Sequence, residues 1–232
     1  MTLAYILAGV TALLVVVLLV GERAAAPWRG WVKGAASAAF IGTALAAGAT
    51  DSAYGGWVLA ALCLGWVGDV SLVSGRRTWF LVGLAAFLLS HLTYIGAFAS
   101  VRPNVVVAVV VAACVLAPAA MVARWLWPHL DADMRGPVLA YIAVITAMVA
   151  AAAGAVASVG PAAPAVAVLT RGEPLPGWVW DATVMAAAVA FYLSDISVAR
   201  DRFVAPDFAN RIWGLPLYYG AQILFALSVG WL

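Results

Sequence analysis

Two aspartates lie inside long apolar stretches and could carry proton-transfer chemistry. Asp69 stands in "GWVGDVSLVSGRR" at 65–77, and Asp195 stands in "FYLSDISVARDRF" at 191–203. An ionisable group in a membrane-spanning segment is costly and usually faces a cavity or a partner. Burial favours the protonated form of a carboxyl group, and a second carboxylate nearby favours it further. The pair therefore predicts a functional site, and a hydrogen bond or an interfacial anchor between packed helices is the alternative role of each acid taken singly.

The two aspartates are predicted to lie at a similar depth in the membrane. Asp69 precedes Arg76 by seven residues, which is about 10 Å of helix. Asp195 precedes Arg200 by five residues, which is about 7–8 Å. The likeness of "DVSLVSGRR" to "DISVARDR" also predicts a parallel repeat of four helices plus four. Matched depth favours one shared site over two separate packing roles.

The composition places this chain in the membrane. Of its 232 residues, 66% are hydrophobic and 9% are charged, and the mean hydropathy is +1.06. A soluble domain is roughly half apolar and about a quarter charged, so this chain lacks the polar surface to cover itself in water. The net charge of +2 gives no indication of nucleic acid as a partner.

Eight stretches are long and apolar enough to span a membrane as helices, which takes about 20 residues each. They lack the alternation typical of barrel strands. The sequence therefore predicts an all-α polytopic membrane protein, with a bundle of eight transmembrane helices in a single domain over residues 1–232. The predicted spans are 2–20, 32–50, 55–74, 79–99, 104–123, 137–157, 178–199 and 212–232, with the longest loop at 158–177.

The cations predict the orientation. With eight spans, ten of the twelve Lys and Arg residues fall on one side, and Arg102 and Arg171 fall on the other. The positive-inside rule then predicts that both termini lie outside the cytoplasm and that both aspartates lie in the cytoplasmic half of the membrane. The membrane that we predict is the inner (plasma) membrane of the cell. No cation precedes the stretch at 2–20, so we predict a first spanning helix and not a cleavable signal.

Several polar side chains in other spans are candidates for the same site. His91 and Tyr94 share one face of the fourth span. Tyr219 and Gln222 share one face of the last span, where Tyr218 also lies near the predicted cytoplasmic end. Hydrogen bonds between helices explain these residues equally well.

Three cations beside the spans are further candidates. Lys33 lies at the mouth of the second span, and Arg76 and Arg77 follow the third. All three are first of all orientation signals. They could also meet a phosphate head group, because long basic side chains extend from a helix toward the membrane surface.

Other chemistries do not fit the sequence. A three-histidine zinc site fails because the chain has two histidines, His91 and His129. Cys63 and Cys114 fall in apolar runs and are interpreted as core residues, neither a disulfide nor a metal site. The serine-hydrolase elbow and the P-loop are missing, and neither aspartate has the G-x-G-D or Y-D context of an intramembrane aspartyl protease. We therefore expect no metal and no cofactor.

Four motifs in order resemble those of the YhhN family of membrane proteins. They are "GDVSL" at 68–72, the F-x-x-x-H-x-x-Y spacing in "FLLSHLTYIGAF" at 87–98, the Ser194-Asp195 helix, and "YYGAQ" at 218–222. The likeness covers most of the chain from Lys33 onward. Where the family often has Lys-Pro at the second span, this chain has Lys33-Gly34.

The resemblance implies eight spans and lysoplasmalogenase activity, the hydrolysis of the vinyl ether of a lysophospholipid to a fatty aldehyde and a glycerophospho-base. Asp69 and Asp195 would be the catalytic pair, one as proton donor and one as carboxylate, as in glycosidases that stabilise a similar cation. The partners implied are the lysophospholipid substrate and membrane lipid, with no sign of an obligate protein partner. The supporting residues would be Lys33, Arg76, Arg77, His91, Tyr94, Ser194, Tyr218, Tyr219 and Gln222.

Two other functions remain open at this point. Eight helices with two membrane acids would also suit a proton-coupled transporter or a lipid flippase. The acids could also simply pack in a lipid-binding scaffold. Release of aldehyde by the purified protein, without a membrane gradient, separates the enzyme from both.

Overall fold

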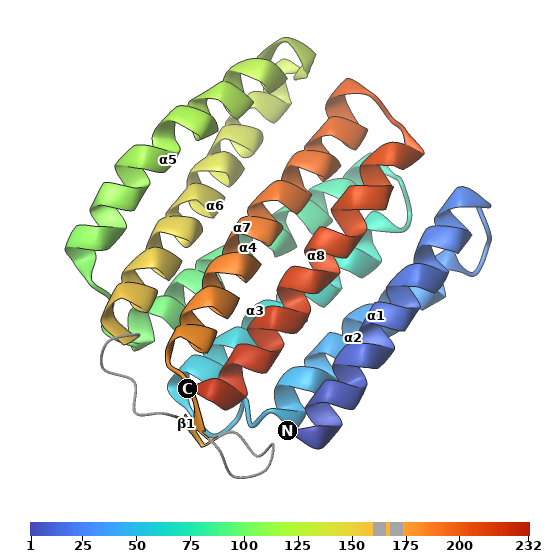
Figure 1. Cartoon of the computed structure of the whole chain (residues 1–232). Helices are drawn as coiled ribbons and strands as arrows, with labels where there is room; N and C mark the ends of the chain where they lie inside the picture. The colour runs from blue at the N-terminus through green and yellow to red at the C-terminus, as the bar shows by residue number, and fades with distance from the viewer. Residues whose placement is uncertain (160–165, 168–173) are drawn as a thin grey trace.

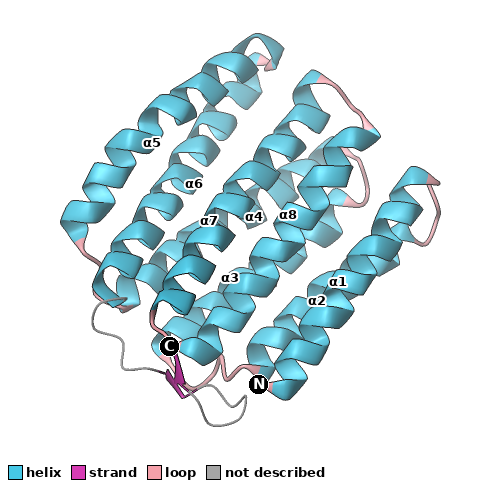
Figure 2. Cartoon of the chain, viewed as in Figure 1, coloured by secondary structure: helices cyan, strands magenta, loops and turns pink. Residues whose placement is uncertain are grey.

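The computed structural model describes residues 1–159, 166–167 and 174–232, and these residues form an all-helical bundle (Figures 1 and 2). The described part holds eight α-helices, three short helical turns and one two-stranded antiparallel ladder. The α-helices are α1 (Thr2–Arg23), α2 (Arg29–Ala46), α3 (Ala53–Leu72), α4 (Arg77–Ser100), α5 (Val105–Leu126), α6 (Ala132–Val159), α7 (Trp178–Ala199) and α8 (Phe208–Ser228). The short elements are η1 (Trp127–His129), η2 (Arg200–Val204), η3 (Val229–Trp231), β1 (Val166–Ala167) and β2 (Pro174–Leu175).

The all-α prediction is confirmed, and each predicted span corresponds to one helix. Within the described residues, seven helices are long and apolar enough to cross a membrane. The exception is α2, whose first two turns carry Arg29 and Lys33. Eight membrane spans therefore remain a prediction, as does the repeat of four plus four. The predicted loop at 158–177 lies largely outside the described residues.

Capping side chains mark the start of three helices, and internal hydrogen bonds satisfy polar side chains within others. Ser52, Asn104 and Asp207 are N-caps whose side chains accept from backbone N–H groups of α3, α5 and α8. Within the helices, hydroxyls such as those of Thr11 and Thr43 donate to the carbonyl one turn earlier. A helix in lipid must satisfy its polar groups internally, and these bonds do so.

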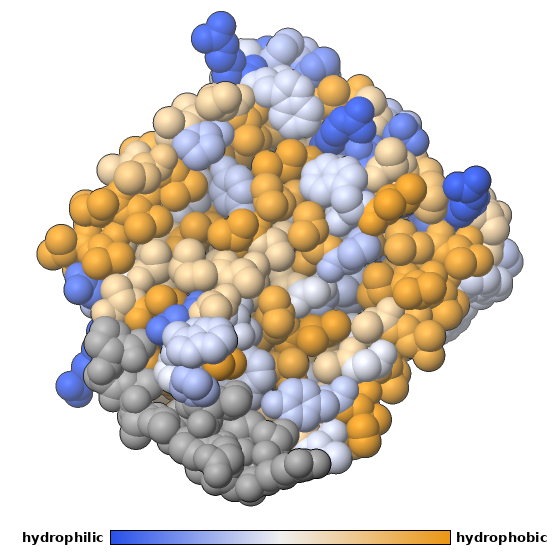
Figure 3. All heavy atoms as spheres, viewed as in Figure 1, coloured by the Kyte–Doolittle hydropathy of each residue, from blue (hydrophilic) through white to orange (hydrophobic). Residues whose placement is uncertain are grey.

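Helices that follow one another pack as antiparallel hairpins, α1 with α2, α3 with α4, α5 with α6, and α7 with α8. Contacts of α8 with α1 and α2, and of α4 with α6, close the bundle. Large buried rings fill its centre, while α5 lies at one edge with an outer face of exposed valines (Figure 1). Apolar side chains also make up much of the face of the bundle seen in Figure 3, and the most hydrophilic residues lie toward its edges. This surface suits lipid, and the seven apolar helices indicate a multi-pass membrane protein.

Both termini lie at the same end of the bundle, and the connections that carry most of the cations lie at the other end (Figure 1). Which end faces the cytoplasm remains a prediction from the positive-inside rule. The interpretation of the cysteines as core residues is wrong, because Cys63 and Cys114 are both free and exposed on outward helix faces. Apolar runs of spanning length include lipid-facing residues, so hydropathy alone did not separate the two locations.

A close approach of α7 and α8 depends on Gly214. A Cβ atom at this position would overlap Ser197 Oγ and come within 2.7 Å of Ser197 Cβ. Gly214→Ala should therefore lower the unfolding free energy by roughly 1–3 kcal/mol, because overpacking forces helices apart. The measurement is the thermal unfolding midpoint in detergent. Gly220→Ala on the same helix is the matched control, since a Cβ there meets nothing within 4 Å; equal midpoints for both variants would show that the approach is unimportant.

Candidate functional site

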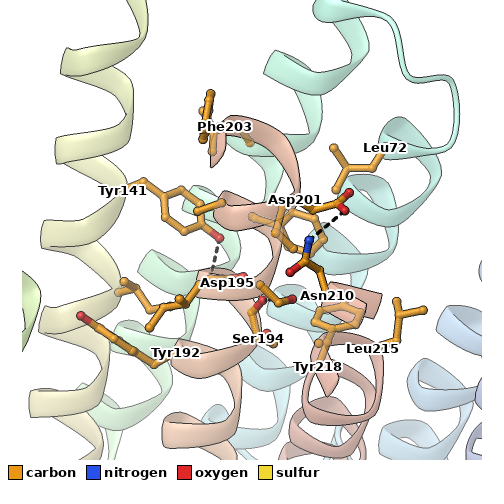
Figure 4. Close-up of a pocket in the computed structure, with 18 of the residues that line it drawn as sticks. Leu72, Tyr141, Tyr192, Ser194, Asp195, Asp201, Phe203, Asn210, Leu215 and Tyr218 are labelled. Atoms are coloured by element: carbon orange, nitrogen blue, oxygen red, sulfur yellow. Dashed lines mark hydrogen bonds between the residues drawn. The ribbon is translucent and has the colours of Figure 1, made fainter. Parts of the chain in front are cut away.

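A cavity of about 250 Å³ lies inside the bundle and is lined by both Asp69 and Asp195. Its walls are mostly apolar, and its polar groups come from helices far apart in the sequence. Figure 4 shows Asp195, Tyr141, Ser194 and Tyr218 around this space. The apolar wall includes Leu72, Phe80, Leu84, Phe87, Val122, Leu126, Val138, Ile142 and Ile145. A space of this kind takes an apolar molecule with a polar reacting group.

Asp69 on α3 is buried and is surrounded by hydrogen-bond donors. The Lys33 Nζ of α2 lies 3.2 Å from Asp69 Oδ1. The hydroxyls of Ser37 and Tyr218 donate to Asp69 Oδ2 at 2.6 and 2.7 Å. A cation and two donors on one carboxyl group fit a carboxylate, which only accepts hydrogen bonds.

A second layer of contacts orders this cluster. Tyr219 of α8 donates to the backbone carbonyl of Lys33 at 3.2 Å, and its hydroxyl lies 3.1 Å from Ser37 Oγ. Ser37 follows Lys33 by one helical turn, so the two side chains lie on the same face of α2. The packing of α2 against α8 therefore sets how the Asp69 carboxylate is held.

Asp195 on α7 has different partners. The hydroxyl of Tyr141 on α6 donates to Asp195 Oδ2 at 2.9 Å, and His91 Nε2 on α4 lies 3.4 Å from the same oxygen. His91 Nδ1 lies 2.6 Å from the Phe87 carbonyl. Because a carbonyl only accepts, Nδ1 carries a hydrogen, and Nε2 is the ring atom that faces Asp195.

Aromatic rings join the two clusters across the cavity wall. The Phe191 ring lies 4.3 Å from the His91 ring and 5.6 Å from the Tyr218 ring, measured between centroids. The Phe87 ring also packs edge-on against Tyr218 at 5.7 Å. These rings connect the residues around Asp195 with those around Asp69 through apolar contacts.

The structure brings most of the predicted site residues to this region. Lys33 and Tyr218 contact Asp69 directly, while His91 lies beside Asp195. Ser194 lines the cavity and donates its hydroxyl to the Phe191 carbonyl at 2.7 Å. Tyr219 reaches the Asp69 cluster through Ser37.

Six predicted residues lie outside the cavity lining in the part of the chain that the structure describes. Two of them, His91 and Tyr219, contact the acid clusters, and the other four are Tyr94, Gln222, Arg76 and Arg77. Tyr94 is buried behind the site and donates to Gln222 Oε1 at 2.7 Å. Arg76 precedes α4 on an exposed turn, and Arg77 forms an ion pair with Asp133 in which both side chains are more than half exposed. Both arginines lie at the surface, outside the cavity lining. A phosphate bound in the cavity would need a cation in that lining, so neither arginine fits this role.

Sequence reasoning missed eight polar residues that the fold places in or beside the cavity: Glu22, Ser37, Tyr141, Tyr192, Ser197, Asp201, Asn210 and Arg211. Ser37 could have been found, because it lies one turn from Lys33. Tyr141 gave no local signal, since a tyrosine near a helix end is common at membrane interfaces. Arg211 was counted as an orientation signal alone, although in the fold it pairs with Glu22.

Among the described residues, no group of three or more His, Cys, Asp and Glu side chains is placed to hold a metal ion. The side chains around the two acids supply carboxyl, imidazole, ammonium and hydroxyl groups. The Asp69 carboxyl group faces an ammonium group and two hydroxyl donors. The Asp195 carboxyl group faces one hydroxyl donor and an imidazole nitrogen, so the two acids have different hydrogen-bond partners.

A family model described as the YhhN family matches residues 28–229. This chain belongs to the YhhN family. The residues around Asp69 and those around Asp195 lie inside the matched range. The resemblance to the YhhN family is therefore confirmed.

Several curated relatives of this YhhN chain carry the name lysoplasmalogenase. The one from Mycobacterium tuberculosis is 35% identical over 178 residues, which is 72% of this chain and 58% of that protein. Lysoplasmalogenase TMEM86A of Bos taurus is 27% identical over 70% of this chain and 60% of its own. Lysoplasmalogenase TMEM86B of Homo sapiens is 31% identical over 70% and 58%. The match thus spans about three fifths of each relative, and no solved structure matches.

Proposed function

We propose that this YhhN protein hydrolyses the vinyl ether bond of lysoplasmalogen-type lysophospholipids, giving a fatty aldehyde and a glycerophospho-base. The observation that carries the proposal is that two aspartates with different hydrogen-bond partners line one mostly apolar cavity. The names of the curated relatives support the same reaction. The membrane location that we propose is the inner (plasma) membrane, with the site in its cytoplasmic half.

Asp195 is the proposed proton donor. Asp195 Oδ2 lies 3.4 Å from His91 Nε2 and lines the cavity, and in this proposal its carboxyl group carries the proton that is transferred. The first step transfers that proton to the outer carbon of the vinyl ether, and the electron pair of the double bond forms the new C–H bond. The inner carbon and the ether oxygen then share the positive charge of an oxocarbenium ion.

Asp69 is the proposed carboxylate. Its negative charge stabilises the oxocarbenium ion, and it accepts a proton from the water that adds to the inner carbon. As the resulting hemiacetal collapses, the Asp195 carboxylate takes up its hydroxyl proton, and protonated Asp69 gives its proton to the glycerol oxygen while the C–O bond breaks. One water is consumed, and both carboxyl groups return to their starting protonation. General acid catalysis of this kind typically contributes about 10²–10⁴-fold.

The remaining polar groups have positioning roles in this proposal. Lys33, Ser37 and Tyr218 hold Asp69 ionised and fixed in direction. Tyr141 holds Asp195 Oδ2 from the opposite side of the cavity wall. The apolar wall receives the alkenyl chain near the reacting bond. Tyr94 and Gln222 support Tyr218 and its helix from behind.

The direct test is aldehyde release by the purified protein in detergent, with no membrane gradient. A 1-alkenyl lysophosphocholine should yield aldehyde in proportion to enzyme, while the matched 1-O-alkyl lysophosphocholine should yield none, because a saturated ether has no carbon to protonate. Folded protein that releases no aldehyde but moves lysolipid between the leaflets of vesicles would contradict the hydrolase and favour the transporter.

A further inference from the structure

A second, smaller pocket of about 110 Å³ adjoins the cavity and has a different character. Its lining is predominantly polar, and it shares Glu22, Lys33, Leu72 and Arg211 with the lining of the larger cavity. The elements that form it are the last turn of α1, the start of α2, the end of α3 and the first turn of α8. It therefore lies at the end of the bundle opposite the termini, where these helices meet the membrane surface (Figure 1).

The side chains of this pocket offer several N–H donors to an anion. Among the described residues that line it, three are cations (Arg29, Lys33 and Arg211) and one is a carboxylate, Glu22. Glu22 accepts from Arg211 and lies 3.9 Å from Arg29 Nε. Glu22 lies between the two guanidinium groups and orients both. Arg211 Nη2 also lies 3.6 Å from Asp201 Oδ2, and Lys33 pairs with Asp69, so each cation of the pocket has a carboxylate partner. The N–H groups of the two arginines that these carboxylates leave free are the donors that an anion would use. Arginine presents several N–H donors in a planar fork, which matches the oxygens of a phosphate.

Lys33 connects the pocket to the proposed reaction. Its Nζ lies 3.2 Å from Asp69 Oδ1, and its side chain lines both spaces. A phosphate bound beside Lys33 would thus lie at the mouth of the cavity, with Asp69 and Asp195 farther in. In a lysophospholipid the glycerol separates the phosphate from the ether bond, so a head group in the small pocket directs that bond toward the acids.

We propose that the small pocket binds the phosphate of a lysophospholipid head group, with Arg29, Lys33 and Arg211 as its ligands and Glu22 as the residue that positions the two arginines. This proposal rests on the proposed function for the identity of the lipid. It assigns the phosphate to cations from the α1–α2 connection and the start of α8, in place of the Arg76 and Arg77 pair that the sequence suggested.

The test measures equilibrium binding in detergent of a radiolabelled 1-O-alkyl lysophosphocholine, which has the head group but no cleavable bond. Arg29→Gln should weaken binding roughly tenfold or more, since it removes a charged donor of the phosphate. Arg211→Gln should do the same, and Arg29→Gln keeps the test decisive if the loss of Arg211 disturbs the fold. Arg124→Gln is the matched control, because Arg124 is exposed on α5 and lies outside the lining of both pockets.

A phosphate-free 1-O-alkylglycerol should bind wild type and Arg29→Gln equally. Equal affinity of both proteins for the phospholipid would overturn the proposal, as would an equal loss in Arg124→Gln, which would indicate surface charge alone. Inorganic phosphate or glycerophosphocholine that competes as well as the lipid would assign the pocket to a soluble anion and also overturn it. Because the ligand is not cleaved, a protein that binds it in this pattern but releases no aldehyde would contradict the hydrolase and leave the phosphate site standing.

Discussion

Asp195→Asn should lower aldehyde release from 1-alkenyl lysophosphocholine by about 10²–10⁴-fold, the usual contribution of a general acid. Asparagine keeps the shape of the side chain and can still accept from Tyr141, but it cannot supply an acidic proton to carbon. The measurement is kcat at saturating lipid, together with binding of the uncleavable 1-O-alkyl analogue. Binding should change little, because the ether lipid has no group that takes this proton.

Asp181→Asn is the matched control for this variant. Asp181 lies in the first turn of the same helix, α7, and outside the lining of the cavity in the part of the chain that the structure describes. Its substitution should leave kcat near that of the wild type. Near-normal turnover by Asp195→Asn would remove Asp195 from the reaction, and the proton would then have to come from another group in the cavity.

Lys33→Met should lower the free energy of unfolding by about 3–5 kcal/mol, because it leaves a buried carboxylate without its cation. The Lys33 side chain is 15% exposed and the Asp69 side chain is 2% exposed, so water replaces little of the lost interaction. The double variant Lys33→Met with Asp69→Asn should recover most of the loss, since no unpaired charge remains. The measurement is reversible unfolding in detergent, monitored by denaturant or heat.

Arg77→Met provides the exposed counterpart of this experiment. Arg77 pairs with Asp133, and both side chains are more than half exposed. Exposed pairs contribute about 0–1 kcal/mol, so this variant should unfold close to the wild type. If Lys33→Met proves as mild as Arg77→Met, Asp69 is not held as an ion in the folded protein, and its proposed role as the carboxylate fails.

The proposed division of roles between the acids comes from their neighbours. Asp69 has an ammonium group and two hydroxyl donors, while Asp195 has a hydroxyl donor and an imidazole nitrogen. Sequence spacing placed both acids at a matched depth but left open which one donates the proton. That assignment needed the identity of residues on α2, α4, α6 and α8, none of which is near either aspartate in sequence.

The phosphate ligands illustrate the same limit. From the sequence, Arg76 and Arg77 were as reasonable as Lys33, because all three lie near the predicted cytoplasmic ends of spans. In the fold the turn before α4 leaves Arg77 with Asp133, while α1, α2 and α8 bring Arg29 and Arg211 to Glu22. Hydropathy and charge counts locate a residue along the membrane normal, but they do not locate it within the plane of the bundle.

The amino-acid sequence by itself determined that this is an all-helical protein of apolar spans, where each helix lies along the chain, and which two acids stand in them. These properties are local, because they follow from the length of an apolar run and from the rise of one helix. The tertiary structure alone decided that Asp69 and Asp195 line a single cavity, that Ser37 and Tyr141 hold them, and that Arg211 and Lys33 line the same pocket. These residues are as far apart in the chain as Lys33 and Arg211, and they come together only once the helices have packed in one particular arrangement.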